Sequence, residues 1–321
     1  MIALILKSVL LLALAIGLAI AGALHYQAGW PWLLALPVGL LAPSASHAAL
    51  LALEFALTLW LGRHAQLPAD ARRYELGGAF RAWLTEIPVA IRVFCWRMPF
   101  FGARKLVSGN DPDRIPVLLV HGYFCNQAMF APLAQHLADA GHRVESLNLE
   151  PVFGSIEAYP ALIDSAIRDA LEGTSHRKIA LIGHSMGGIA IRAYLRRYGL
   201  DQVGPVITLG SPHQGTALAR VGHTEIVRQL SPGNPWLLQL EADEDPTMYR
   251  RFTVVLSEHD NIVTPQRSQT LPGARTVAFT GLGHVDLACH PAVWSVIEDG
   301  LGETRLPAEP LTPWQSADGL A

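Results

Sequence analysis

The sequence predicts an α/β fold, a mostly parallel sheet with helices on both faces, preceded by an N-terminal pair of membrane helices. From Arg114 onward, short apolar runs of strand length alternate with helical stretches, which is typical of a parallel sheet covered on both faces. Two long apolar segments with almost no charge come before this region. Half of the 321 residues are hydrophobic and only 16% are charged, which agrees with a membrane part joined to a folded domain.

The first apolar segment, residues 2–24, contains a single charge, Lys7. A helix of this length matches the roughly 30 Å hydrocarbon core of a bilayer. A cleaved signal peptide is the alternative, because Lys7 precedes the apolar run and "AIAGA" offers small residues near its end. We favour a membrane span, since the run is long for a signal peptide and more apolar sequence follows.

The second apolar segment, residues 30–61, contains only Glu54 as a charge, and its first half is expected to be a poor continuous helix because of three prolines. The connection "HYQAGWPW" has no Lys or Arg, whereas arginines follow the second run closely. By the positive-inside rule, residues 1–62 form a transmembrane hairpin with both ends in the cytoplasm. The prolines are Pro31, Pro37 and Pro43, and the arginines are Arg63, Arg72, Arg73 and Arg81.

Residues 63–110 are predicted to be an amphipathic linker. Apolar residues recur at helical spacing at Phe80, Trp83, Leu84, Ile87, Ile91 and Phe94. This helix either lies in the membrane interface or packs on the main domain, and the pattern favours neither. Pro88 is expected to kink it in both cases.

Residues 111–305 form the predicted main domain, followed by a tail over 306–321. Its strands are "IPVLLV", "RVESLNL", "KIALIG", "VGPVITL", "FTVVL" and "RTVAF", and its helices include 127–140, 156–172, 187–198 and 291–299. The segment 214–250, rich in Pro, Gly and acidic residues, interrupts this alternation where a cap would cover a site.

The strand "KIALI" leads directly into Gly183-His184-Ser185-Met186-Gly187, which matches G-x-S-x-G between a strand and a helix. Glycines are expected at 183 and 187 because side chains there would collide with neighbouring backbone in so sharp a turn. The turn would project Ser185 above the sheet as a nucleophile. A phosphate-binding turn is the alternative, but the P-loop lysine and the G-x-G-x-x-G spacing are both missing.

A serine nucleophile needs a histidine base and a carboxylate that orients it. Asp260 in "VVLSEHDNIVTP" and His284 in "VAFTGLGHVDL" follow predicted strands, and the order Ser185, Asp260, His284 is that of this strand–turn–helix motif. Three competitors for the acid and base roles are Glu258, His259 and Asp286.

The loop "VLLVHGYFCN" is expected to supply a second oxyanion donor, so that the backbone N–H groups of Tyr123 and Met186 form the oxyanion hole. His121 and Gly122 would shape this loop. We expect His121 only to brace it through hydrogen bonds.

The segments "HGY", "GHSMGG", "GSPHQGT", "HDNIVTP" and "GLGH" resemble the α/β-hydrolase superfamily and, within it, bacterial lipases and esterases, over residues 115–300. The resemblance implies an α/β-hydrolase fold, hydrolysis of carboxylic esters through an acyl-enzyme, and no cofactor. Some such lipases bind calcium near the catalytic histidine, and Asp286 with Asp243 or Asp245 would be the matching carboxylates here, although no metal site is expected.

The expected function is therefore that of a membrane-anchored serine hydrolase acting on lipid or other acyl esters, with its catalytic domain on the cytoplasmic side of a bacterial inner membrane. A thioesterase or an acyltransferase would use the same acyl-enzyme, and a catalytically silent membrane scaffold would keep the fold alone. The net charge of −3 gives no basic stripe, which excludes nucleic acid as a partner, and three cysteines without metal spacing favour a reducing compartment. Oligomeric state, acyl chain length and head group stay open.

Overall fold

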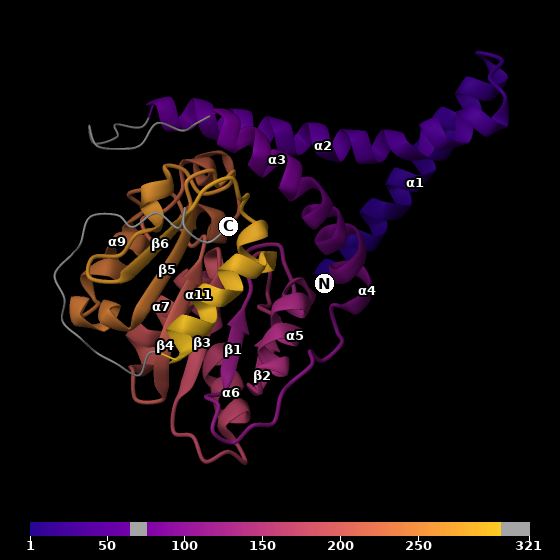
Figure 1. The fold of residues 1–321 in the computed structure, drawn as a ribbon. Coiled ribbons are helices and arrows are strands. Elements are labelled where there is room, and N and C mark those ends of the chain that lie inside the picture. Colours follow the sequence, from indigo (N-terminus) through magenta and orange to yellow (C-terminus); the bar gives the residue numbers. More distant parts are fainter. Residues whose placement is uncertain (65–75, 303–321) are drawn as a thin grey trace.

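The computed structural model describes residues 1–64 and 76–302 (Figure 1). Arg72, Arg73 and the tail over 306–321, which entered the expectations above, lie outside the described residues.

One six-stranded sheet forms the centre of the domain, with strand order β2-β1-β3-β4-β5-β6 and all neighbouring strands parallel. The strands are β1 (Val117–Val120), β2 (Val144–Leu147), β3 (Ile179–His184), β4 (Val203–Leu209), β5 (Phe252–Ser257) and β6 (Arg275–Phe279). All six predicted strands are confirmed. The side chains of β1, β3 and β5 are buried on both faces, which explains their near-continuous apolar runs.

Helices cover both faces of the sheet. Leu118 and Val120 of β1 pack in the same cluster as α6 and α7, whereas Val117 and Leu119 point the other way and pack with α5 and α11. The helices of the domain are η2 (Gln127–Phe130), α5 (Ala131–Asp139), η3 (Ile156–Ala158), α6 (Tyr159–Leu171), α7 (Met186–Tyr198), η6 (Gln266–Gln269), α10 (Asp286–Cys289) and α11 (Pro291–Gly302). The four predicted helices are confirmed.

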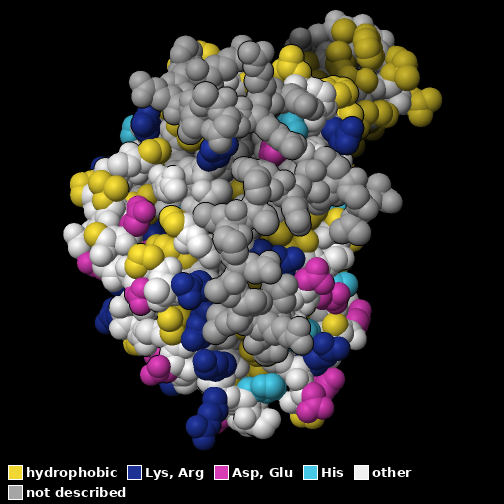
Figure 2. All heavy atoms as spheres, turned by 60° about the vertical axis from the view of Figure 1, so that its left-hand side comes forward, with side chains coloured by type: hydrophobic (Ala, Val, Ile, Leu, Met, Phe, Trp, Pro, Cys, Tyr) yellow, Lys and Arg dark blue, Asp and Glu magenta, His cyan; other side chains and the backbone are white. Residues whose placement is uncertain are grey.

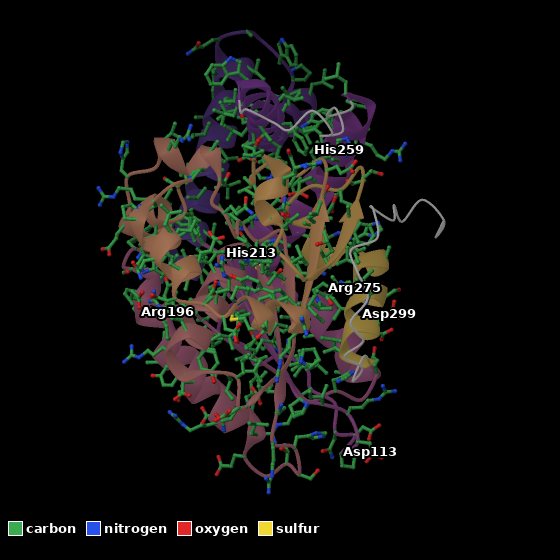
Figure 3. All side chains as sticks on the ribbon, turned by 90° about the vertical axis from the view of Figure 1, so that its left-hand side faces the viewer. Asp113, Arg196, His213, His259, Arg275 and Asp299 are labelled. Atoms are coloured by element: carbon green, nitrogen blue, oxygen red, sulfur yellow. The ribbon has the colours of Figure 1, made fainter. Side chains whose placement is uncertain are left out.

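The segment between β4 and β5 folds as a set of short helices in the place of the expected cap. They are η4 (Ala217–Val221), α8 (Glu225–Gln229), α9 (Pro235–Ala242) and η5 (Pro246–Arg251). A fully buried ion pair between Arg192 of α7 and Glu244 joins this segment to the domain, and Arg192 also donates to the carbonyl oxygen of His213. Figure 3 shows His213 inside the domain.

Two apolar helices precede the domain, α1 (Ile2–Tyr26) and α2 (Trp32–His64), and both are long and apolar enough to cross a membrane. They pack closely, because a Cβ added at Gly39 would lie 2.3 Å from the carbonyl oxygen of Gly17. The expectation that prolines would interrupt the second helix is wrong, since α2 continues through Pro37 and Pro43. A proline removes one N–H from a helix, and a long helix tolerates that loss.

Both ends of this hairpin are seated on the domain, while its tip projects away from it (Figure 1). Ile2 and Leu6 are buried in the same cluster as Val93 and Met98. Phe55 and Thr58 are buried near the end of α2. The first turns of α1 and the last turns of α2 therefore face protein, so the apolar segment that protein leaves uncovered is shorter than residues 2–24 suggest.

The linker contains three consecutive helical segments, α3 (Leu76–Ala90), η1 (Ile91–Arg97) and α4 (Met98–Phe101). The widened π-helical turns of η1 begin at Ile91, three residues after Pro88, the position at which the sequence predicts a kink. The linker packs on α2 through Ala79 and Ala82 and on the domain through larger residues, among them Val93 and Met98. Glu86 and Ala90 of α3 are also buried. The predicted apolar stripe is packed only in part: Phe80 and Leu84 are 59% and 49% exposed, whereas Trp83 and Phe94 pack against buried clusters.

Candidate active site

Ser185 occupies the sharp turn between β3 and α7, with φ +56° and ψ −129°. A positive φ is strained for a residue with a side chain, and such strain is concentrated at functional sites. The expected collisions at the flanking glycines are present: a Cβ at Gly187 would lie 2.1 Å from the carbonyl oxygen of Val120, and one at Gly183 2.6 Å from the nitrogen of Gly188. Ser185 is partly exposed between buried neighbours, as a nucleophile requires.

The loop after β1 runs directly beside Ser185, since a Cβ at Gly122 would lie 2.8 Å from the Cβ of Ser185. Met186 opens α7, and N–H groups in the first turn of a helix have no partner within the helix. Tyr123 and Met186 both line a small hollow with about 160 Å³ of empty space, open solvent included. The structure therefore brings the two expected oxyanion residues together beside the serine.

The close approach at Gly122 gives a test of this arrangement. We expect Gly122→Ala to lower kcat/KM for a short soluble ester by on the order of 10²-fold, because the added methyl group displaces the oxyanion loop from Ser185. Steady-state kinetics measure the effect. Gly302→Ala is the control, because a Cβ there meets no atom within 4 Å. Equal activity of the Gly122 variant and the wild type would contradict a role for this loop.

His121 braces the same loop, in agreement with expectation. Its Nε2 accepts from the N–H of Leu149 at 3.0 Å, so its Nδ1 carries the proton and donates to the carbonyl oxygen of Gly122 at 2.9 Å. Burial lowers the pKa of His121 to about 4. The ring is therefore neutral near pH 7 and serves as a fixed link between the two loops.

Asp260 and His284 meet at the same edge of the sheet. Nδ1 of His284 donates to Oδ2 of Asp260 at 2.9 Å, and the two side chains are almost fully buried. Oδ1 of Asp260 accepts from the N–H groups of Ile262 and Val263, both at 2.8 Å. These bonds fix the carboxylate, and the carboxylate fixes the tautomer of His284 with Nε2 free to accept a proton.

One residue next to Ser185 also contacts His284. His184, which precedes the serine, donates from Nε2 to the carbonyl oxygen of His284 at 3.0 Å, and the two rings lie 4.7 Å apart. Burial lowers the pKa of His184 to about 3, and the nearby His284 contributes to this shift. His184 therefore stays neutral and ties the serine turn to the histidine loop.

Two of the three competitors, His259 and Asp286, make side-chain hydrogen bonds to groups other than Ser185 and His284. His259 accepts at Nδ1 from the N–H of Gly281 and lies at the end of the domain next to the N-terminal helices (Figure 3). Asp286 accepts from the hydroxyl of Thr85 at 2.7 Å and from the N–H of Gly283 at 3.3 Å. Glu258 follows β5, and its N–H donates to Phe279.

The carboxylates considered for calcium do not gather. Asp243 pairs with Arg196, and Asp245 accepts from the N–H of Thr247, whereas Asp286 receives the two donors named above. Over residues 1–64 and 76–302, no group of three or more His, Cys, Asp or Glu side chains is placed to hold a metal.

Three polar residues lie around the site that the sequence did not predict to be part of it: Asn261, Glu54 and Glu86. Asn261 accepts the N–H of His284 at Oδ1 and donates from Nδ2 to Glu54 of α2, and Glu86 of α3 accepts from the N–H groups of Val285 and Asp286. Glu54 did carry a signal, as the only charge in a long apolar run, and isolated carboxylates in such runs are commonly functional.

Comparison with known proteins agrees with the fold. The profile of the family described as "alpha/beta hydrolase fold" matches residues 115–247. Triacylglycerol lipases of Burkholderia plantarii and Vibrio cholerae are 26% and 30% identical over 153 and 130 residues, which are 41% and 39% of this chain. The mature lipase BlEst2 of Bacillus licheniformis has a TM-score of 0.54 at 19% identity, covering 61% of this chain and 95% of that one. The chain spans only 42% and 39% of the lengths of the two triacylglycerol lipases.

Proposed function

We propose that this chain, which has the α/β-hydrolase fold and resembles lipases and esterases, is a membrane-anchored serine hydrolase that cleaves carboxylic esters of lipids through an acyl-enzyme. One observation carries the proposal: a serine in a strained strand-to-helix turn lies at the same sheet edge as a buried Asp–His pair, and His184 joins the two.

In the proposed mechanism, Oγ of Ser185 attacks the ester carbonyl carbon while Nε2 of His284 takes the serine proton. Asp260 stabilises the imidazolium that forms. The N–H groups of Tyr123 and Met186 bind the oxyanion of the tetrahedral intermediate. Its collapse breaks the ester bond, and His284 gives its proton to the leaving alcohol. Water then attacks the acyl-enzyme by the same steps and releases the free acid, so every proton is accounted for without a cofactor.

The surface of the hairpin supports a lipid environment. Large apolar side chains are exposed along both helices, among them Leu11, Leu12, Leu33 and Leu41, and Figure 2 shows hydrophobic side chains covering the projecting part. Residues 9–26 form about 27 Å of helix, close to the thickness of the hydrocarbon core.

Aromatic residues lie at both ends of this apolar segment. Tyr26, Trp30 and Trp32 are exposed at the tip of the hairpin, which would lie at the membrane–water interface on the side away from the domain. Trp96 and Phe100 are exposed on η1 and α4, at the domain end of the hairpin. The two hairpin ends are seated on the domain, so the domain and both ends lie on one side of the bilayer, the cytoplasmic side if the arginines near α2 follow the positive-inside rule.

A test uses the full-length chain in vesicles of anionic phospholipid. We expect a fluorophosphonate probe, which reacts with activated serines, to label the protein, and free fatty acid to be released from acylglycerol or phospholipid in the same vesicles. Transfer of the acyl group to an added alcohol without release of acid would indicate an acyltransferase. Labelling and hydrolysis both absent would contradict the proposal and indicate a silent scaffold.

The exposed aromatic face of the linker gives a second prediction. We expect the double replacement Trp96→Ser with Phe100→Ser to lower the ratio of vesicle-lipid activity to soluble-ester activity severalfold, because both rings would sit at the lipid head groups near Arg92. Leu238→Ser on α9 is the control, since Leu238 is 54% exposed on the cap, away from the linker. An unchanged ratio in the double variant would show that this face does not meet lipid.

A further inference from the structure

The loop that carries His284 is held by a carboxyl group from outside the α/β domain. Glu86 of α3 is 1% exposed, and its Oε1 and Oε2 accept from the N–H groups of Val285 and Asp286 at 2.8 and 3.0 Å. The fit is tight, because a Cβ added at Gly283 would lie 2.3 Å from Oε2 of Glu86. The carboxyl group therefore lies directly against the two residues on either side of His284.

A second contact from the N-terminal helices acts on the neighbouring turn. The hydroxyl of Thr58 in α2 donates to the carbonyl oxygen of Asn261 at 2.7 Å, and Glu54 accepts from Nδ2 of the same asparagine at 3.0 Å. Oδ1 of Asn261 accepts the N–H of His284 at 3.0 Å. Three consecutive backbone N–H groups, those of residues 284, 285 and 286, are thus bound by side chains that belong to, or are held by, α2 and α3.

Burying a carboxyl group to stabilise a loop costs free energy, because the group loses its hydration. Burial raises the pKa of Glu86 well above its usual range, and the nearby Asp286 raises it further, while the two N–H donors lower it. An apolar side chain would avoid this desolvation cost, but it would leave the buried N–H groups of Val285 and Asp286 without these acceptors. The two short hydrogen bonds from Glu86 also fix the position of the loop backbone beside His284. Such positioning matters because displacement of a catalytic group by about 1 Å costs on the order of 10²-fold in rate.

We propose that Glu86 is a positioning residue for His284. In this proposal, α2 and α3 help to orient the catalytic imidazole toward Ser185. The proposal rests on the proposed function, in which His284 is the general base. Glu86 itself touches no substrate, and it acts through the backbone of residues 285 and 286.

Glu86→Gln in the full-length protein tests this role. The amide keeps the shape of the carboxyl group but turns an NH₂ donor toward one of the two N–H donors, so one hydrogen bond is lost and the loop must shift. For a short soluble ester we expect kcat to fall about 10- to 100-fold with KM changed less than about twofold. We also expect slower fluorophosphonate labelling and a displaced acid limb in the pH profile of kcat/KM, since that limb reports the free base.

Glu172→Gln is the matched control, because Glu172 is exposed at the end of α6. A merely structural role for Glu86 would lower the thermal midpoint but leave kcat and the pH profile of the folded protein unchanged, and that result would overturn the proposal.

If Glu86→Gln does not fold, Thr58→Val tests whether the N-terminal helices position His284. It preserves shape and removes only the hydroxyl donor to Asn261, and we expect a smaller fall in kcat with the same displacement of the pH profile. Wild-type kcat and profile in this variant would then contradict the proposal. Ser185→Ala separates the two ideas: if it stays active the proposed function fails, whereas if it is inactive and the Glu86 and Thr58 variants match the wild type, only the positioning role fails.

Discussion

Ser185→Ala is expected to lower ester hydrolysis by on the order of 10⁴-fold or more and to abolish fluorophosphonate labelling. The strained turn gives this position its access to substrate, and only its hydroxyl oxygen can form the proposed acyl bond. A methyl group fits the same space, so the fold should be retained. Rates on a short soluble ester, with circular dichroism and thermal unfolding as checks of the fold, measure the effect.

Ser295→Ala is a suitable control, because Ser295 is exposed on α11. Residual activity above the uncatalysed rate is expected in the Ser185 variant, since the N–H groups of Tyr123 and Met186 would still bind the oxyanion. Near-native activity, or probe labelling at another serine with unchanged turnover, would show that the nucleophile has been assigned wrongly.

Asp260→Asn should produce the second large loss, again on the order of 10⁴-fold in kcat near neutral pH. If the amide oxygen continues to accept from the N–H groups of Ile262 and Val263, the NH₂ group faces Nδ1 of His284. His284 must then place its proton on Nε2, where it can no longer accept the proton of Ser185. The loss should appear in kcat, with the thermal midpoint little changed.

Glu258→Gln is the comparison for this variant, because Glu258 was the other acid in the same sequence segment. We expect its effect to be far smaller, since Asp260 makes the bond to the His284 ring. A crippled Glu258 variant beside a nearly normal Asp260 variant would require the two roles to be exchanged.

Sequence alone predicted those parts of the candidate site that depend on local geometry. The sharp turn at Ser185 was predictable because G-x-S-x-G between a strand and a helix obeys steric rules that act over a few residues. Asp260 and His284 followed because both come after parallel strands, whose carboxyl ends meet at one edge. Their prediction required only that the strands be parallel, and not which strands are neighbours in the sheet.

The side chains that hold the His284 loop could not be predicted from the sequence, because their hydrogen bonds join segments far apart in the chain. Glu86 meets Val285 and Asp286 about two hundred positions along the chain, and no local rule links them. The linker shows the same limit, since its large apolar residues predicted a helix but not what that helix packs on, and Ala79 and Ala82 are among its buried residues. Small residues allow close approach, and hydrophobic size does not report that property.

If α2 spans a membrane as proposed, its contact with Asn261 links the chemistry of the site to bilayer thickness. In the proposed arrangement, the outer part of α2 lies in lipid while Thr58 and Glu54 hold the asparagine that binds His284. A membrane helix that is longer or shorter than the local hydrocarbon core tilts to reduce the mismatch. Tilting α2 would pull on Asn261, so the turnover of the enzyme would vary with the acyl length of the surrounding lipids, even for a substrate dissolved in water.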